Sequence, residues 1–186
     1  MEGTTGTGKA SNRPQATRPD PSEHAPYYGK YIALVPDGDI LATLETQGRE
    51  TARLLAGLNE QQAAHRYAPD KWSVKEVIGH VADSERIFAY RALRIARGDQ
   101  TQIEGFEQDD YVRAAQFDRL SVADLAAEFT AVRQATLRLF EGLSPDAWTR
   151  RGVANNNEVS VRALAYMIAG HELHHRQILR EKYGME

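Results

Sequence analysis

The chain of 186 residues contains no cysteine. This absence excludes disulfide bonds, zinc sites built from thiolates and a cysteine nucleophile. A metal ion would therefore have to be bound by histidine, aspartate or glutamate side chains. Any thiol that takes part in the chemistry has to come from a substrate or a cofactor.

Long apolar runs and blocks of basic residues are also missing. No stretch reaches the roughly 18 consecutive apolar residues of a membrane span, so we expect no membrane helix. The formal net charge of -3 favours neither nucleic acid nor a membrane surface as a partner. The N-terminal residues lack the apolar core of a signal peptide, so a cytoplasmic protein is expected.

The N-terminal segment differs in composition from the rest of the chain. Residues 1–26 are rich in Gly, Thr, Pro and Ala and contain almost no large apolar side chain. Such a segment buries too little apolar surface to fold on its own. We therefore expect a disordered or loosely attached tail over residues 1–26, followed by one domain over residues 27–186, which is long enough for a sizeable core.

Four amphipathic segments are predicted to form the helices of this domain. Each begins at a capping residue and ends near a glycine, which is typical of helix boundaries. They span residues 39–57, 73–96, 121–142 and 160–184. The long connection 98–120 crosses from the second helix to the third, and QDDYVRAAQ within it indicates a short helix. No strand pattern is convincing, so the prediction is an all-α four-helix bundle.

A weak internal repeat relates the second helix to the fourth. SVKEVIGH in the second resembles SVRALAYMIAGH in the fourth. Each begins at a serine cap and ends at a Gly-His pair, and the two spacings differ by about one helical turn.

Residues 169–177 read AGHELHHRQ and place three histidines and a glutamate on the fourth helix. At about 100° per residue, His175 lies about 40° from His171, and both fall within the apolar stripe of that helix. His174 falls on the shoulder of the stripe. Burying two imidazoles is unfavourable unless their ring nitrogens are satisfied, and a divalent metal satisfies both at once. The pair therefore indicates a metal site.

A third ligand is needed, and His80 on the second helix is the candidate because it lies at the edge of the buried face. His24 lies in the tail and His65 in a polar linker, so neither is well placed. Three histidines would leave a coordination position open for water or substrate, as in catalytic sites. Asp83, one turn after His80, could orient its ring or act as a base, although an exposed carboxylate is the simpler interpretation.

The same helix contains the pattern H-E-x-x-H, which is typical of zinc proteases. In such proteases the glutamate must reach a metal-bound water, but Glu172 points toward the far edge of the stripe. Only Glu181 and Glu186 follow as candidate ligands, and no strand is predicted that could pair with an extended peptide. We therefore reject a protease.

Other residues have simpler interpretations. Trp72, Trp148 and Phe129 are expected to pack in the core or at its ends and not to contact a cofactor. Arg151 and residues 155–157 could line the mouth of the site, although a solvated loop is the simpler expectation.

Four segments together resemble the DinB/YfiT-like family: YGKYIALVPDGDILATL, KWSVKEVIGHVADSE, FTAVRQATLRLFEGLSPDAW and SVRALAYMIAGHELHHRQIL. The resemblance covers residues 28 to 183 and is most specific in GHVADSE and GHELHHRQ. It implies a four-helix bundle of up-down-down-up topology that is commonly dimeric. It also implies a divalent metal, nickel or zinc most often, bound by His80, His171 and His175.

The resemblance leaves the activity open. The leading hypothesis is a metal-dependent hydrolase in which a metal-activated water attacks a small molecule. The first alternative is a metal-dependent S-transferase in which the metal activates a low-molecular-weight thiol. The second is a non-enzymatic, metal-binding stress-response protein, and a bundle whose histidines only form hydrogen bonds is the purely structural alternative.

Overall fold

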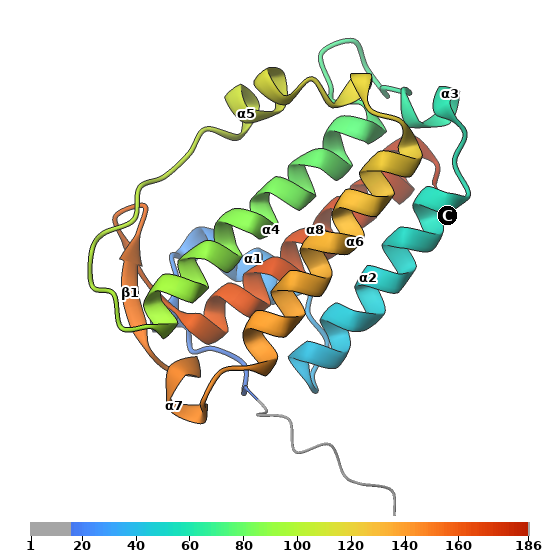
Figure 1. Cartoon of the computed structure of the whole chain (residues 1–186). Helices are drawn as coiled ribbons and strands as arrows, with labels where there is room; N and C mark the ends of the chain where they lie inside the picture. The colour runs from blue at the N-terminus through green and yellow to red at the C-terminus, as the bar shows by residue number, and fades with distance from the viewer. Residues whose placement is uncertain (1–15, 186) are drawn as a thin grey trace, which may run out of the picture.

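The computed structural model describes residues 16–185 (Figure 1). Its four long helices are α2 (Ile40–Ala56), α4 (Val74–Ala96), α6 (Val122–Glu141) and α8 (Val161–Tyr183). Shorter elements connect or flank them: α1 (Gly29–Ile32), α3 (Glu60–Ala63), α5 (Gln108–Ala115), α7 (Pro145–Trp148) and the 3-10 turns η1 (Pro21–Glu23), η2 (Pro26–Tyr28) and η3 (Phe117–Arg119). The predicted all-α bundle is confirmed, including the short helix in the long connection.

The four long helices begin where their capping residues predict. The side chain of Asp39 accepts a hydrogen bond from the first turn of α2. Ser73 and Glu76 form a reciprocal capping box at the start of α4, and Ser121 and Ser160 cap α6 and α8. These side chains satisfy backbone N–H groups that have no partner within the helix, which is why local sequence sets these boundaries so well.

The helices run up, down, down and up in chain order (Figure 1). Helices α4 and α6 are parallel neighbours, and α8 packs against α4 while α2 packs against α6 and α8. A connection between parallel neighbours must return along the length of the bundle. The crossover between α4 and α6, which carries α5 and η3, covers this distance on the outside of the bundle.

One element contradicts the expectation that the chain contains no strand. Strands β1 (Arg151–Ala154) and β2 (Asn157–Ser160) form an antiparallel hairpin just before α8. Its two-residue turn consists of Asn155 and Asn156, which both have positive φ angles, 49° and 60°. Asparagine tolerates this conformation, and two-residue turns of this kind match the twist of a hairpin. The Asn-Asn pair between RGVA and NEVS was the local signal.

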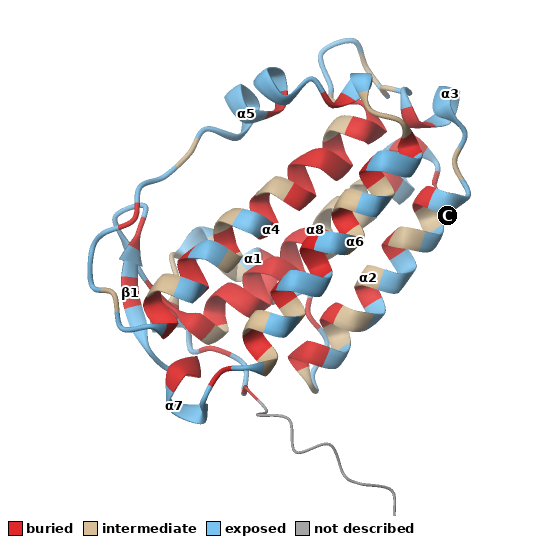
Figure 2. Cartoon of the chain, viewed as in Figure 1, coloured by how far each residue is buried: buried red, intermediate tan, exposed pale blue. Residues whose placement is uncertain are grey.

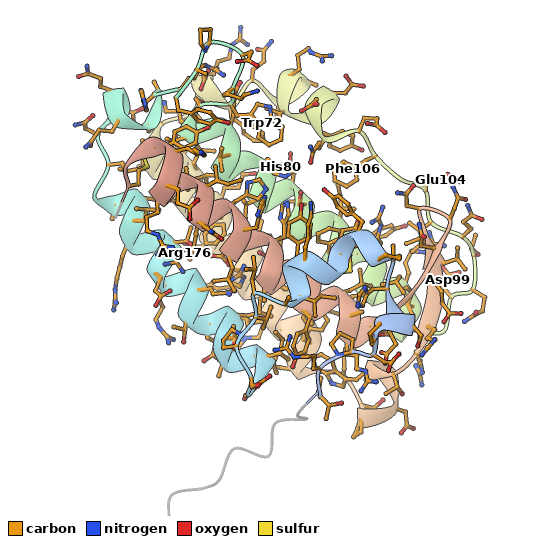
Figure 3. All side chains as sticks on the ribbon, turned by 180° about the vertical axis from the view of Figure 1, so that it is seen from behind. Trp72, His80, Asp99, Glu104, Phe106 and Arg176 are labelled. Carbon is orange, nitrogen blue, oxygen red and sulfur yellow. The ribbon has the colours of Figure 1, made fainter. Side chains whose placement is uncertain are left out.

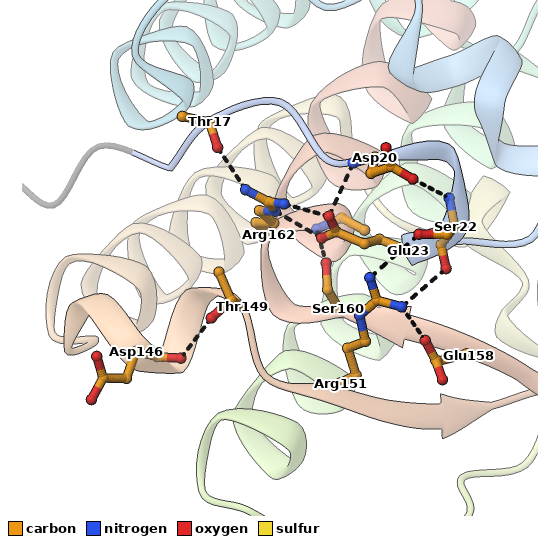
Figure 4. A network of polar contacts seen from close by, with 11 residues as sticks. Thr17, Asp20, Ser22, Glu23, Asp146, Thr149, Arg151, Glu158, Ser160 and Arg162 are labelled. Atoms are coloured by element: carbon orange, nitrogen blue, oxygen red, sulfur yellow. Dashed lines mark hydrogen bonds and ion pairs between the residues drawn. The ribbon is translucent and has the colours of Figure 1, made fainter.

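The predicted loose tail begins outside the described residues, but its last part, residues 16–26, packs against the bundle. Ala16 and Glu23 are buried. Arg162 on α8 donates hydrogen bonds to both carboxylate oxygens of Glu23 and to the hydroxyl of Thr17 (Figure 4). The expectation of a loosely attached segment is therefore wrong for these residues. Polar contacts hold them in place, since Arg18 also donates hydrogen bonds to the backbone oxygens of Ile32 and Val35.

The core occupies the centre of the bundle, where the inward faces of the four long helices are buried (Figure 2). Phe129 is fully buried, and Trp148 stacks on Phe140 with ring centroids 5.3 Å apart. These contacts confirm the packing roles predicted for Phe129 and Trp148. Within residues 16–185, no helix combines the length and the apolar content that crossing a membrane requires.

The Glu23–Arg162 ion pair predicts a pH-dependent stability. Hydrogen bonding to Arg162 lowers the pKa of Glu23 from its ordinary value of 4.5 to about 2. A depressed pKa in the folded state contributes stability above the unfolded pKa, and this contribution is lost as the pH falls toward the folded pKa. Replacing Glu23→Gln should lower the free energy of unfolding at pH 7 by on the order of 2 kcal/mol.

Urea unfolding of both proteins between neutral pH and about pH 3 measures this difference. The gap between parent and variant should narrow as the pH falls below 4.5, because the parent loses its ion pair. A gap that stays constant with pH would show that the ionisation of Glu23 contributes nothing.

Candidate metal centre

The three histidines predicted to bind a metal lie together in the interior of the bundle. His80 comes from the second turn of α4, and His171 and His175 come from successive turns of α8. The Nε2 atom of His171 lies 3.1 Å from that of His80 and 3.1 Å from that of His175. One ring nitrogen of each histidine lies within 4.8 Å of the others, which is the spacing of a metal site. Figure 3 shows His80 pointing inward from α4.

Burial keeps these imidazoles in the form that binds metals. His80 and His171 are buried and His175 is half-buried. Burial lowers the pKa of His80 to about 4, and burial with nearby imidazoles lowers the pKa of His175 to about 3. The pKa of His171 also falls well below its ordinary value because of burial. All three rings are therefore neutral near pH 7 and present nitrogen lone pairs without first losing a proton.

Aromatic rings surround the cluster. The ring centroid of Trp72 lies 4.8 Å from that of His80, and the Tyr31 and Phe88 centroids lie 5.6 Å and 6.0 Å from that of His171. The sequence-based interpretation of Trp72 as packing alone is therefore incomplete, because its ring also covers one of the three histidines (Figure 3). These rings form an apolar wall beside polar donor atoms, which is the usual composition of a small-molecule site.

Each of the two Gly-His pairs marks a close crossing of chain segments. A Cβ atom on Gly79 would lie 2.4 Å from the ring of Phe117 in the crossover. A Cβ atom on Gly170 would lie 2.1 Å from the backbone oxygen of Tyr31 in α1. The weak repeat in the sequence therefore has a physical meaning. In both helices a glycine lets a neighbouring segment press against the backbone one residue before a histidine of the cluster.

Glu172 of the H-E-x-x-H pattern points away from the histidines into a separate network. It is buried, accepts a hydrogen bond from the Thr51 hydroxyl at 2.5 Å and pairs with Arg133 at 2.6 Å. Arg133 also pairs with Glu85 at 2.7 Å. A carboxylate held in this way cannot reach a water on the histidine cluster, which supports the rejection of a protease.

Asp83 on α4 makes its contacts on the side of α6, away from the histidine cluster. Its carboxylate accepts a hydrogen bond from Arg86 at 3.1 Å, and Arg86 also pairs with Glu128 of α6 at 2.7 Å. Burial raises the pKa of Asp83, and the Arg86 guanidinium opposes this shift. These contacts point toward α6, whereas His80 faces α8. A role for Asp83 in orienting His80 or acting as a base stays a prediction.

The remaining histidines lie outside the cluster. His174 contacts the ring of Tyr31 at 5.1 Å from the shoulder of α8, as its position on the helical wheel predicts. The ring of His65 lies 6.1 Å from that of Tyr183, and His24 bonds to the backbone oxygen of the next residue. Within the described part of the chain, the only cluster with metal-ligand spacing is that of the three predicted histidines.

The hairpin loop does not reach the histidines. Gly152 packs against Ile95 near the end of α4, several turns from His80. Arg151 bonds to Glu158 and Ser22 (Figure 4). The side chain of Asn156 accepts a hydrogen bond from the crossover. The expectation that this loop lines the mouth of the site is not supported.

A groove of about 820 Å³ lies on another part of the surface. It is lined by α2, α3 and the last turns of α8, including Leu58, Gln62, Arg180 and Tyr183, and by none of the three clustered histidines. The candidate site is therefore identified by the positions of the histidine nitrogens and not by this groove.

The fold and this cluster define a class of protein: a four-helix bundle with an up-down-down-up topology and a three-histidine site of the kind that binds divalent metals. The sequence signature of the DinB superfamily matches residues 43–179. Because the match covers most of the chain, the protein belongs to the DinB superfamily.

Two bacterial proteins extend this comparison. The chain is 25% identical over 138 residues to a protein of Oceanobacillus iheyensis named "putative metal-dependent hydrolase", a match that covers 73% of this chain and 78% of that protein. YfiT from Bacillus subtilis, described as a probable metal-dependent hydrolase with an unusual four-helix bundle topology, superposes with a TM-score of 0.69 at 14% identity. That superposition covers 94% of this chain and 98% of YfiT.

A mycothiol-dependent maleylpyruvate isomerase also has a similar structure, with a TM-score of 0.64 at 14% identity. The similarity covers 83% of this chain but only 63% of the isomerase. At this level of identity, both structural matches show a shared fold and nothing beyond it.

The close crossing at Gly170 leads to a prediction. Replacing Gly170→Ala should push α1 away from α8 and lower the free energy of unfolding by about 1 to 3 kcal/mol, because the added methyl group meets a backbone oxygen that cannot rotate away. Gly57→Ala is the matched control, since its Cβ atom would meet the nearest oxygen at an ordinary 3.5 Å. Equal urea midpoints for the two variants would contradict the close-packing role of Gly170.

The network at Glu172 leads to a second prediction. Glu172→Gln should lower the free energy of unfolding by about 1 to 3 kcal/mol, because a buried charge-assisted pair is lost. Zinc uptake should be unchanged, since this side chain points away from the histidines. Glu128→Gln, at a partly exposed ion pair, should change stability by less than about 1 kcal/mol. Loss of zinc in Glu172→Gln without loss of stability would refute this assignment.

Proposed function

We propose that this protein is a metal-dependent hydrolase that acts on a small molecule. The observation that carries the proposal is the convergence of three neutral imidazole nitrogens, from His80, His171 and His175, within 4.8 Å of one another in the bundle interior. The names of the Oceanobacillus relative and of YfiT point to the same activity. The arrangement suits catalysis because three protein ligands leave a coordination position open.

The donor set fits a divalent transition metal. Two buried imidazoles and a half-buried one need a partner for their lone pairs, and a cation supplies it. Imidazole nitrogen suits zinc, copper, iron and nickel, and we infer zinc or nickel from the resemblance to the DinB/YfiT-like family. When bound in such a site, the metal lowers the pKa of a coordinated water toward about 7.

The chain itself holds the ligands in place and shapes the site. The tight crossings at Gly79 and Gly170 keep Phe117 and Tyr31 against the two helices that carry the histidines. The Tyr31 hydroxyl lies 3.0 Å from that of Tyr27. Burial, together with this hydrogen bond, raises the pKa of Tyr31, so its phenol stays protonated and can donate a hydrogen bond to a substrate. The surrounding rings exclude bulk water and favour a small substrate over a polymer.

A metal-dependent thiol S-transferase is the second candidate. The similarity in fold to an enzyme named as mycothiol-dependent is one reason to consider it. The orientation of the carboxylates is the other: Glu172 and Asp83 both make their contacts away from the histidines. A thiol that ionises on the metal needs no carboxylate base beside it, whereas a hydrolase without such a base depends on the metal alone to ionise water.

The metal content of the protein purified without an affinity tag tests the common basis of both candidates. The parent should carry about one transition-metal ion per chain, and His175→Ala should lose it. His174→Ala is the matched control, because this neighbouring histidine lies outside the cluster, and it should retain the metal. A parent that takes up neither zinc nor nickel on incubation would refute metal binding and leave a bundle with core histidines.

Cobalt substitution then separates an open site from a closed one. Adding a hydroxamate or a small thiol to the cobalt-loaded parent should change its visible spectrum, because an open coordination position accepts the added ligand. Turnover of small esters and amides would support the hydrolase, and turnover only in the presence of a thiol would support the transferase. A spectrum that no added ligand changes would favour the non-enzymatic metal-binding protein.

A further inference from the structure

Arg91 is a buried cation for which the described chain provides no counter-ion. Three lysine or arginine side chains are buried in residues 16–185: Lys75, Arg91 and Arg133. Lys75 pairs with the carboxylate of Glu60 at 2.6 Å, and Arg133 pairs with two carboxylates. Arg91, with only 3% of its surface exposed, pairs with none within the described residues. Burying an unpaired charge is unfavourable for folding, so its presence calls for an explanation.

The hydrogen bonds of Arg91 leave part of its guanidinium unsatisfied. Its Nη2 atom donates to the backbone oxygen of Glu104 at 2.9 Å, and the side chain also interacts with the Tyr28 hydroxyl. Its Nε atom is buried and has no hydrogen-bond partner among residues 16–185. The N–H groups of a guanidinium form a planar fork that matches the two oxygens of a carboxylate. The unused donor is thus available to an anion that is not part of the protein.

Arg91 lies on the same side of α4 as the histidine cluster. It follows His80 by eleven residues, which places the two side chains about 20° apart around the helix. The Phe88 ring connects them: its centroid lies 5.9 Å from the guanidinium carbon and 6.0 Å from the ring of His171. In Figure 3, His80 and Glu104, whose backbone oxygen Arg91 contacts, are both seen along this side of the bundle.

A second positive charge, that of Lys30, lies beside the aromatic rings that surround the cluster. The Lys30 ammonium lies 4.1 Å from the ring centroid of Tyr27 and 4.9 Å from that of Tyr31, whose ring in turn contacts His171. Three neutral imidazoles would leave the charge of a divalent metal uncompensated. The side chain of Glu104 is exposed and contributes only its backbone oxygen to Arg91. A substrate that carries negative charge would balance this side of the bundle.

We propose that Arg91 binds the carboxylate of the substrate, so that the substrate is a small carboxylic acid whose reacting group lies at the histidine cluster. This inference rests on the proposed function, since it assumes an open metal at the three histidines. The carboxylate occupies the free Nε donor, and the Phe88 ring lies between the anion and the metal. The aromatic wall then contacts the body of the molecule between its two polar ends.

Calorimetric binding of paired thiols to the zinc-loaded, full-length protein tests the proposal. The probes are mercaptopropionate, mercaptohexanoate and mercaptoundecanoate, each compared with the mercapto-alcohol of the same length. The thiolate end reports an open metal, and the other end differs only in its charge. The parent should bind at least one acid about tenfold or more tightly than its alcohol, the strength expected of a charge-assisted hydrogen bond.

Two variants complete the experiment. Arg91→Met should lose the preference for the acid and bind the alcohols as the parent does. Arg91→Lys keeps the charge but not the fork, so it should retain only part of the preference. Unchanged zinc content and alcohol binding confirm that each variant is folded, and Arg91→Lys carries the comparison if Arg91→Met does not fold.

The outcomes separate the two proposals. If the parent shows no preference at any length, or if both variants keep the full preference, Arg91 only anchors the crossover and the carboxylate site is wrong. In that case binding of the alcohols still supports an open metal. If the zinc-loaded protein binds neither series, the open metal site is wrong and the carboxylate site falls with it.

Discussion

The geometry of the whole bundle depends on one buried interaction, the pairing of Arg133 with two carboxylates. Arg133 on α6 bonds to Glu85 on α4, to Glu172 on α8 and to the backbone oxygen of Leu44 on α2. All four long helices therefore meet at one guanidinium. Taking these charges out of water is favourable only when every partner is in place, so the network selects one rotation for each helix. With Glu172 turned toward Arg133, the adjacent His171 faces α4 and His80.

This arrangement gives the two faces of α8 different functions. One face forms the ion pair with Arg133, and the other carries His171 and His175. Burial disfavours the charged form of these two imidazoles, so they stay neutral. The segments that cover the histidines, α1 and the crossover, are seated on glycines instead of on large side chains. The Arg133 network fixes the orientation of α8, and α1 and the crossover cover the histidines. A preorganised site requires both kinds of support.

How far the sequence predicts this structure depends on the range of the interactions involved. Helix limits follow from caps and periodicity, which are local, and the histidines were found because two of them interrupt an apolar stripe. The packing of residues 16–26 depends on Arg162, which is more than a hundred residues away in the sequence. The burial of Glu172 depends on Arg133, which is about forty residues away. No local pattern reveals such partners. The hairpin was missed although its Asn-Asn turn is a local signal.

Arg91 illustrates the limit most clearly. On a helical wheel it is an ordinary charged residue, and only the structure reveals that no carboxylate within residues 16–185 pairs with it. Elsewhere the same chain balances its buried cations with carboxylates, at Arg133 and at Lys75. If stability were the only requirement, Arg91 would be paired with a carboxylate or replaced by an apolar residue. A residue that departs from the stabilising pattern of the rest of a protein is often a functional residue. Arg91 is such a residue, and only the Phe88 ring separates it from the histidine cluster.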